Sequence, residues 1–167
     1  MNYPKKTAQA TMIAVSILFS TQSSASEQVA DRAEVFVIPK LMRFRFAVTA
    51  DHARSIGCHY QIEDFQGLSA LSEIVKNDET VDFASNDITR SYFVVVDLVH
   101  NSKNYITYAF DADEKNGNVI AKITYENERS VYSEFPADTT DNIRKFLNGR
   151  NFYISGTEYK NQPCNFK

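Results

Sequence analysis

The stretch that most constrains the fold of this chain is residues 91–135, where short apolar runs follow one another between polar turns. Residues 92–99 are apolar at alternate and intervening positions alike, which is typical of a central strand buried on both faces. Residues 105–110, 119–125 and 131–135 alternate between apolar and polar side chains, the period of half-buried strands. Sequential strands joined by short turns pair antiparallel, so this stretch predicts a β-meander.

The rest of the chain supplies shorter elements on either side of the meander. Residues 34–38 predict an edge strand or an extended arm because Pro39 ends the run, and residues 41–48 alternate as a half-buried strand does. A helical turn is expected at 51–57, a short strand at 60–62, helices at 67–77 and 138–148, and a last strand at 152–154.

These elements predict an α+β fold. We expect an antiparallel meander sheet of four to six strands, with two helices packed on one face and one disulfide. A sheet of this kind can leave its other face to water. The polar, irregular residues 77–90 form the longest predicted loop, and long loops in compact domains are often functional.

The N-terminal residues have the layout of a secretory signal peptide. Lys5 and Lys6 precede a short apolar run at residues 12–19, and Ser23 and Ala25 stand at positions −3 and −1 of a cleavage site. The apolar run is shorter than the roughly 18–20 residues of a membrane span, although a short N-terminal anchor stays an alternative. The sequence therefore predicts a signal peptide at 1–25 and a single exported domain at 26–167, periplasmic or secreted.

The charge of the exported part is negative. Without the two leader lysines, 16 basic residues stand against 21 acidic ones, a net charge of −5. Nucleic-acid binding needs a basic face, and binding to anionic lipid needs a cluster of Lys or Arg. We therefore expect no nucleic-acid partner, and no membrane association after signal cleavage.

The chain has two cysteines, Cys58 and Cys164. Export passes through an oxidising compartment and two cysteines allow one pairing, so we predict a Cys58–Cys164 disulfide. A closed loop of this length stabilises by about 4.7 kcal/mol in the chain-entropy model. The alternative is a nucleophilic or redox cysteine, but no C-x-x-C motif supports it.

Candidate catalytic residues are few. Asp51, His52 and His59 could form a His/Asp acid–base pair, but their spacing does not specify convergent metal ligands. The acidic residues from Asp111 to Glu114 resemble the start of an EF-hand loop, yet Asn116 stands where that motif requires glycine. We read them as a solvated hairpin turn, and predict no metal and no cofactor.

Tyrosines are the more informative residues of the meander. Four of them could share one face of the sheet, depending on the strand register, and tyrosine is enriched at protein interfaces; these are Tyr92, Tyr105, Tyr125 and Tyr132. The alternative is that their rings pack in the core beneath the helices.

The sequence has no clear catalytic or cofactor motif and no basic face, and it is rich in tyrosine. These features favour a small exported, non-enzymatic protein that binds another protein, of inhibitor, immunity or accessory type. The alternative is a small secreted hydrolase that uses a His/Asp pair around residues 51–59. A structural subunit of a secreted assembly is a third possibility, which a long exposed edge strand would favour.

Overall fold

The computed structural model describes residues 30–39, 42–76, 80–81, 90–115, 118–156 and 164. In chain order, the elements are β1 (Arg32–Val37), α1 (Ala50–Ile56), β2 (Cys58–Ile62), α2 (Phe65–Val75), β3 (Thr80–Val81), β4 (Tyr92–His100), β5 (Lys103–Lys115), β6 (Asn118–Tyr125), β7 (Ser130–Pro136), α3 (Thr139–Asn148) and β8 (Tyr153–Ser155). The α+β class is confirmed.

One antiparallel sheet joins the strands in the order β3-β7-β6-β5-β4-β1-β2-β8. Seven of these strands have three or more residues, and β3 adds a two-residue pairing at one edge. The predicted four to six strands and two helices are therefore too few. The third helix, α1, is the element expected only as a helical turn at 51–57, and the two-residue strand β3 is too short to show a period of its own.

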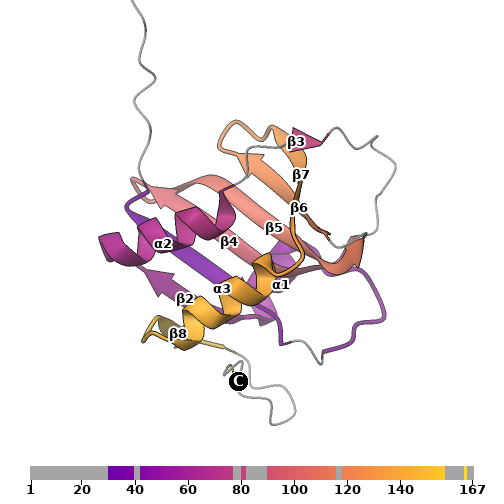
Figure 1. Cartoon of the computed structure of the whole chain (residues 1–167), viewed down its shortest axis with the longest axis horizontal. Coiled ribbons are helices and arrows are strands. Elements are labelled where there is room, and N and C mark those ends of the chain that lie inside the picture. Colours follow the sequence, from indigo (N-terminus) through magenta and orange to yellow (C-terminus); the bar gives the residue numbers. More distant parts are fainter. Residues whose placement is uncertain are drawn as a thin grey trace, which may run out of the picture.

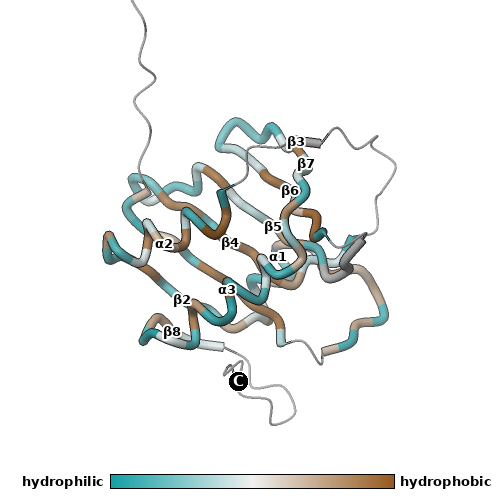
Figure 2. Tube along the Cα trace, in the orientation of Figure 1, coloured by the Kyte–Doolittle hydropathy of each residue, from teal (hydrophilic) through white to brown (hydrophobic). Residues whose placement is uncertain are grey.

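The two longer helices lie on one face of the sheet and α1 lies on the other (Figure 1). The larger core contains Leu71 and Val75 of α2, Ile143 and Leu147 of α3, and inward residues of the central strands such as Val96. The smaller core, on the opposite face, includes Ala53 of α1. Brown apolar segments accordingly run along β4 between the helical layers (Figure 2). The face expected to be open to water is thus partly covered.

The meander is confirmed, with β4, β5, β6 and β7 paired in sequence. Strand β5 continues to Lys115, so the expected solvated turn starting at Asp111 is wrong. Asp111 is buried and its Oδ2 accepts a hydrogen bond of 2.7 Å from Nη1 of Arg90. The predicted turn at Asn116 lies outside the described residues.

Two predictions at the N-terminal end need correction. The strand predicted at 34–38 is present as β1, but it is interior, between β4 and β2, because Pro39 follows the strand and removes no hydrogen bond from it. Residues 42–48 form no strand. Both edges of β1 are already paired, and Val48 bonds instead to Ser91 and Tyr92 near the start of β4.

The predicted disulfide between Cys58 and Cys164 is present, with 5.7 Å between the Cα atoms. It ties residue 164 to the start of β2. The hydroxyl of Tyr60 donates a hydrogen bond of 2.6 Å to the carbonyl oxygen of Cys164, which fixes the same position a second time.

Candidate functional site: a tyrosine-lined pocket

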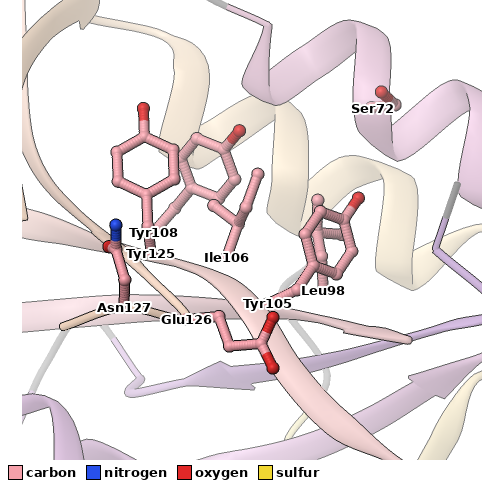
Figure 3. Close-up of a pocket in the computed structure, with 8 residues that line it drawn as sticks. All are labelled: Ser72, Leu98, Tyr105, Ile106, Tyr108, Tyr125, Glu126 and Asn127. Atoms are coloured by element: carbon pink, nitrogen blue, oxygen red, sulfur yellow. The ribbon is translucent and has the colours of Figure 1, made fainter. Parts of the chain in front are cut away.

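A pocket of about 640 Å³ opens on the helix-bearing face of the sheet, beside α2 (Figure 3). Strands β4, β5 and β6, one residue of α2 and the turn that follows β6 supply its lining: Ser72, Leu98, Tyr105, Ile106, Tyr108, Tyr125, Glu126 and Asn127. Figure 3 shows the aromatic rings standing up from the sheet, with Ser72 on the helix above them.

Strand register explains why most of these residues meet. Ile106 pairs with Leu98 on one side and with Tyr125 on the other, so the three share a face. Tyr108 lies two residues along β5 and therefore points the same way. Leu98 of β4 pairs with Ile106 of β5, but the next residue, Val99, pairs with Asn104. The register therefore shifts by one residue at Tyr105, which lies between the two paired positions of β5. A bulge breaks the alternation of side chains, which lets consecutive residues of β5 line one pocket.

Backbone hydrogen bonds hold the wall of the pocket. The N–H of Glu126 donates to the carbonyl oxygen of Tyr105 at 2.9 Å, which ties the turn to β5. The N–H of Tyr125 donates to Arg129 at 2.9 Å, and the N–H of Glu128 donates to Tyr125 at 2.8 Å. Glu128 has a positive φ of 62°, which closes the tight turn. The side chains of Tyr125 and Glu126 are therefore presented on a fixed backbone.

The neighbouring phenols of the pocket affect the pKa of Tyr108. Burial, and then the neighbouring phenols of Tyr125 and Tyr105, raise the pKa of Tyr108 to about 12. Its hydroxyl is therefore neutral at physiological pH. The floor, by contrast, is aliphatic, made by Leu98 and Ile106. The pocket combines an apolar base, aromatic walls and a rim of hydroxyl, amide and carboxylate groups, which suits a ligand with an apolar stem and a polar end.

The structure divides the four predicted tyrosines between the two faces of the sheet. Tyr105 and Tyr125 line the pocket. Tyr92 packs against the smaller core on the α1 face, where burial, and then the electrostatic interaction and hydrogen bond with the Tyr132 phenol, raise its pKa. Sequence reasoning missed the pocket role of Tyr108, although its alternation with Ile106 in the predicted strand was a usable signal.

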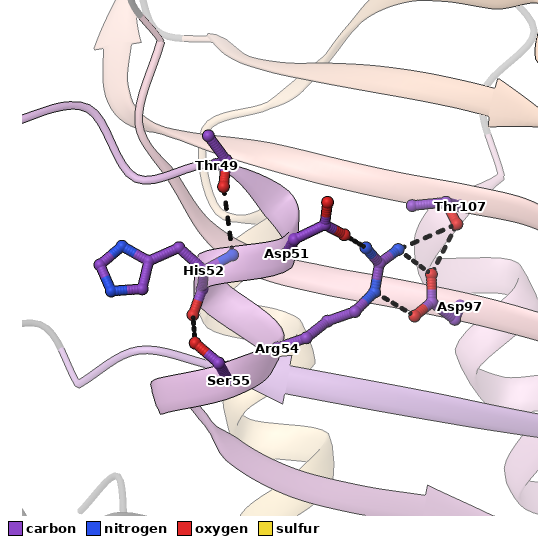
Figure 4. A network of polar contacts seen from close by, with 7 residues as sticks. All are labelled: Thr49, Asp51, His52, Arg54, Ser55, Asp97 and Thr107. Atoms are coloured by element: carbon purple, nitrogen blue, oxygen red, sulfur yellow. Dashed lines mark hydrogen bonds and ion pairs between the residues drawn. The ribbon is translucent and has the colours of Figure 1, made fainter.

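The candidate catalytic residues do not form a common site. The carboxylate of Asp51 accepts a hydrogen bond of 2.6 Å from Arg54, and the ring of His52 points away from it (Figure 4). His52 stacks instead on Phe46, with 5.7 Å between ring centroids. The nearby Ser55 hydroxyl donates to the backbone oxygen of His52, which is a helix-surface contact.

His59 lies on β2 in different surroundings. Its ring stacks on Phe36 at 4.6 Å between centroids, and its Nε2 is 3.4 Å from Oε2 of Glu34. Glu34 also pairs with Arg32 at 3.0 Å. Within the described ranges, no group of three or more His, Cys, Asp or Glu side chains is placed to hold a metal ion.

Comparisons with protein-family models, with curated proteins and with solved structures found no match. In the part of the chain that the structure describes, none of the helices has the length and apolar character needed to span a membrane.

Proposed function

We propose that this chain is an exported, non-enzymatic protein that binds another protein, and that the tyrosine pocket is the centre of its contact surface. The observation that carries the proposal is the gathering of Tyr105, Tyr108 and Tyr125 in one pocket with a polar rim. Protein interfaces have this composition, with aromatic anchors at the centre and solvated polar residues around them.

The exposure of the pocket residues supports the same function. Tyr125 is 36% exposed, a large fraction for a ring that stands on an aliphatic floor. Covering it would remove apolar surface from water while its hydroxyl finds a partner, the property that enriches tyrosine at interfaces. Glu126 and Asn127 are exposed beside it and form a polar edge.

Export is part of the proposal. The signal-peptide pattern of residues 1–25 motivates it, and the Cys58–Cys164 disulfide is compatible with an oxidising compartment. The hydrolase alternative gains no support, because Asp51 is bound to Arg54 and His52 packs on Phe46.

Site-specific photo-cross-linking in the producing cells tests this function. A photoreactive phenylalanine analogue replaces Tyr125 in one variant and Tyr153, which is 47% exposed on β8, in the control. We expect one discrete protein adduct from position 125 and none from position 153. Absence of an adduct at position 125, or equal adducts at both positions, contradicts the proposal.

The purified partner then allows a quantitative test. Truncating an interface hot spot costs at least about 2 kcal/mol, so we expect Tyr125→Ala to weaken binding by roughly 30-fold in isothermal titration calorimetry. Tyr153→Ala is the matched control and keeps the affinity of the unmodified protein.

A further inference from the structure

The pocket has a single charged side chain. Of its eight lining residues, only Glu126 carries a charge, and no Lys or Arg is among them. A carboxylate beside the faces of aromatic rings favours a negative potential in the pocket. Such a site repels an acidic ligand and attracts a cation.

The aromatic walls select for a cation in a second way. Three phenol rings line the pocket, and the rings of Tyr108 and Tyr125 lie next to each other, with Tyr105 beyond Ile106 (Figure 3). A cation near an aromatic face is attracted by the ring quadrupole, more strongly where water is displaced. The aliphatic stem of lysine or arginine packs at the same time on apolar surface, which Leu98 and Ile106 provide here.

The backbones that carry the carboxylate and the first aromatic ring are held together before any ligand arrives. Glu126 and Tyr105 are joined by the 2.9 Å backbone hydrogen bond between β5 and the turn. A site on a fixed backbone loses little conformational entropy on binding. The pocket volume of about 640 Å³ also has the size range of small-ligand sites, so an extended basic side chain fits with its solvating water.

We propose that this pocket receives a positively charged side chain, lysine or arginine, that the protein partner inserts between Tyr105, Tyr108 and Tyr125 and that Glu126 pairs with. The inference rests on the proposed function, because it specifies which chemistry of the partner the pocket recognises.

Capped amino acids test the chemistry of the pocket without the partner. N-acetyl-arginine amide and N-acetyl-lysine amide are titrated into the disulfide-bonded protein at pH 8. Tyrosine ring signals in NMR spectra report binding. We expect the two cationic probes to shift the signals of Tyr108 and Tyr125, and to lose affinity as salt is added. Capped leucine and capped glutamate amides should shift neither.

Two conservative variants of one turn provide the decisive comparison. Glu126→Gln removes the pocket charge and keeps the shape, and we expect at least a tenfold loss of affinity for the cationic probes. Glu128→Gln removes a charge from the same turn outside the pocket, and should change the affinity less than twofold. Equal binding of the leucine probe, or equal effects of the two variants, overturns the proposal.

The outcomes separate this inference from the proposed function. Probe binding that depends on Glu126, without a protein adduct at position 125, retains the cation pocket and rejects protein binding. A protein adduct at position 125 whose affinity is unchanged by Glu126→Gln retains protein binding and rejects the cation pocket.

Discussion

The guanidinium of Arg54 binds the carboxylate of Asp97 through two hydrogen bonds of 2.8 Å, one from Nε and one from Nη2. Asp97 is 2% exposed, and its Oδ1 also accepts a 2.6 Å hydrogen bond from the hydroxyl of Thr107 (Figure 4). The hydrogen bonds to Asp97 raise the pKa of Arg54, while burial lowers it. This pair links α1 to β4, a central strand of the sheet.

Removing the arginine leaves a buried charge without its counter-ion. We expect Arg54→Met to lower the free energy of unfolding by about 3–5 kcal/mol, measured by urea denaturation. Asp51→Asn is the control, because Asp51 is 93% exposed on its side chain and exposed pairs contribute about 0–1 kcal/mol. If Arg54→Met lowers the free energy of unfolding no more than Asp51→Asn does, the Arg54–Asp97 pair does not stabilise the packing of α1 on the sheet.

The Cys58–Cys164 disulfide should stabilise the fold. We expect the double variant Cys58→Ser/Cys164→Ser to lose about 2–5 kcal/mol of unfolding free energy. The reason is that its unfolded chain is no longer constrained by a cross-link between two residues separated by 106 positions. Thiol reductant should bring the unmodified protein to the stability of the variant and leave the variant unchanged. Equal melting temperatures with and without reductant would refute this.

Gly57 ends α1 where the backbone passes close to its neighbours. A Cβ at this position would lie 2.6 Å from the carbonyl oxygen of Ala53 and 3.3 Å from the nitrogen of Val37. Backbone atoms cannot move aside as a side chain can, so Gly57→Ala should destabilise the fold by about 1–3 kcal/mol. Gly149→Ala is the matched control at the end of α3, where the nearest atoms would be 3.8 Å away. Thermal unfolding of the two variants side by side should show a lower midpoint for Gly57→Ala alone.

Alkaline pH should destabilise the protein through Tyr108. Its pKa in the folded state, about 12, lies above the unperturbed value of 10.0, so folding favours the neutral phenol. The contribution is complete below pH 10 and is lost as the pH rises from 10 to 12, by at most about 2–3 kcal/mol for this group. Unfolding free energies at pH 8, 10 and 12 measure the loss, and Tyr108→Phe should reduce it. A stability that rises above pH 10 would contradict the assignment.

Several features of the fold could be predicted from the sequence because they depend on local pattern. The period of two in residues 91–135 predicts the meander strands. Leu71 with Val75, and Ile143 with Leu147, repeat at helical spacing and face the core as expected. The Cys58–Cys164 pairing could be predicted from the presence of two cysteines and from the expectation of export.

Other features depend on residues far apart in sequence. The interior place of β1 follows from long-range pairing with β4, which its own six residues do not encode. Residues 42–48 alternate as a strand does, but the adjacent strand β1 is already paired on both sides. They therefore pack as an irregular segment, with Phe46 65% exposed. The surroundings of the catalytic candidates likewise depend on the tertiary structure. Asp51 accepts a hydrogen bond from Arg54, and the ring of His59 stacks on Phe36.

By itself, the sequence determined the class of fold, the order of the main strands and the one possible disulfide, since periodicity and composition act within a few residues. Only the tertiary structure decided which tyrosines meet. A register shift between β4 and β5 brings Tyr105 to the side of Ile106, and the pairing of β5 with β6 places Tyr125 across from Ile106. A change of one residue in either register would turn these rings to the opposite face, and no local pattern records that choice.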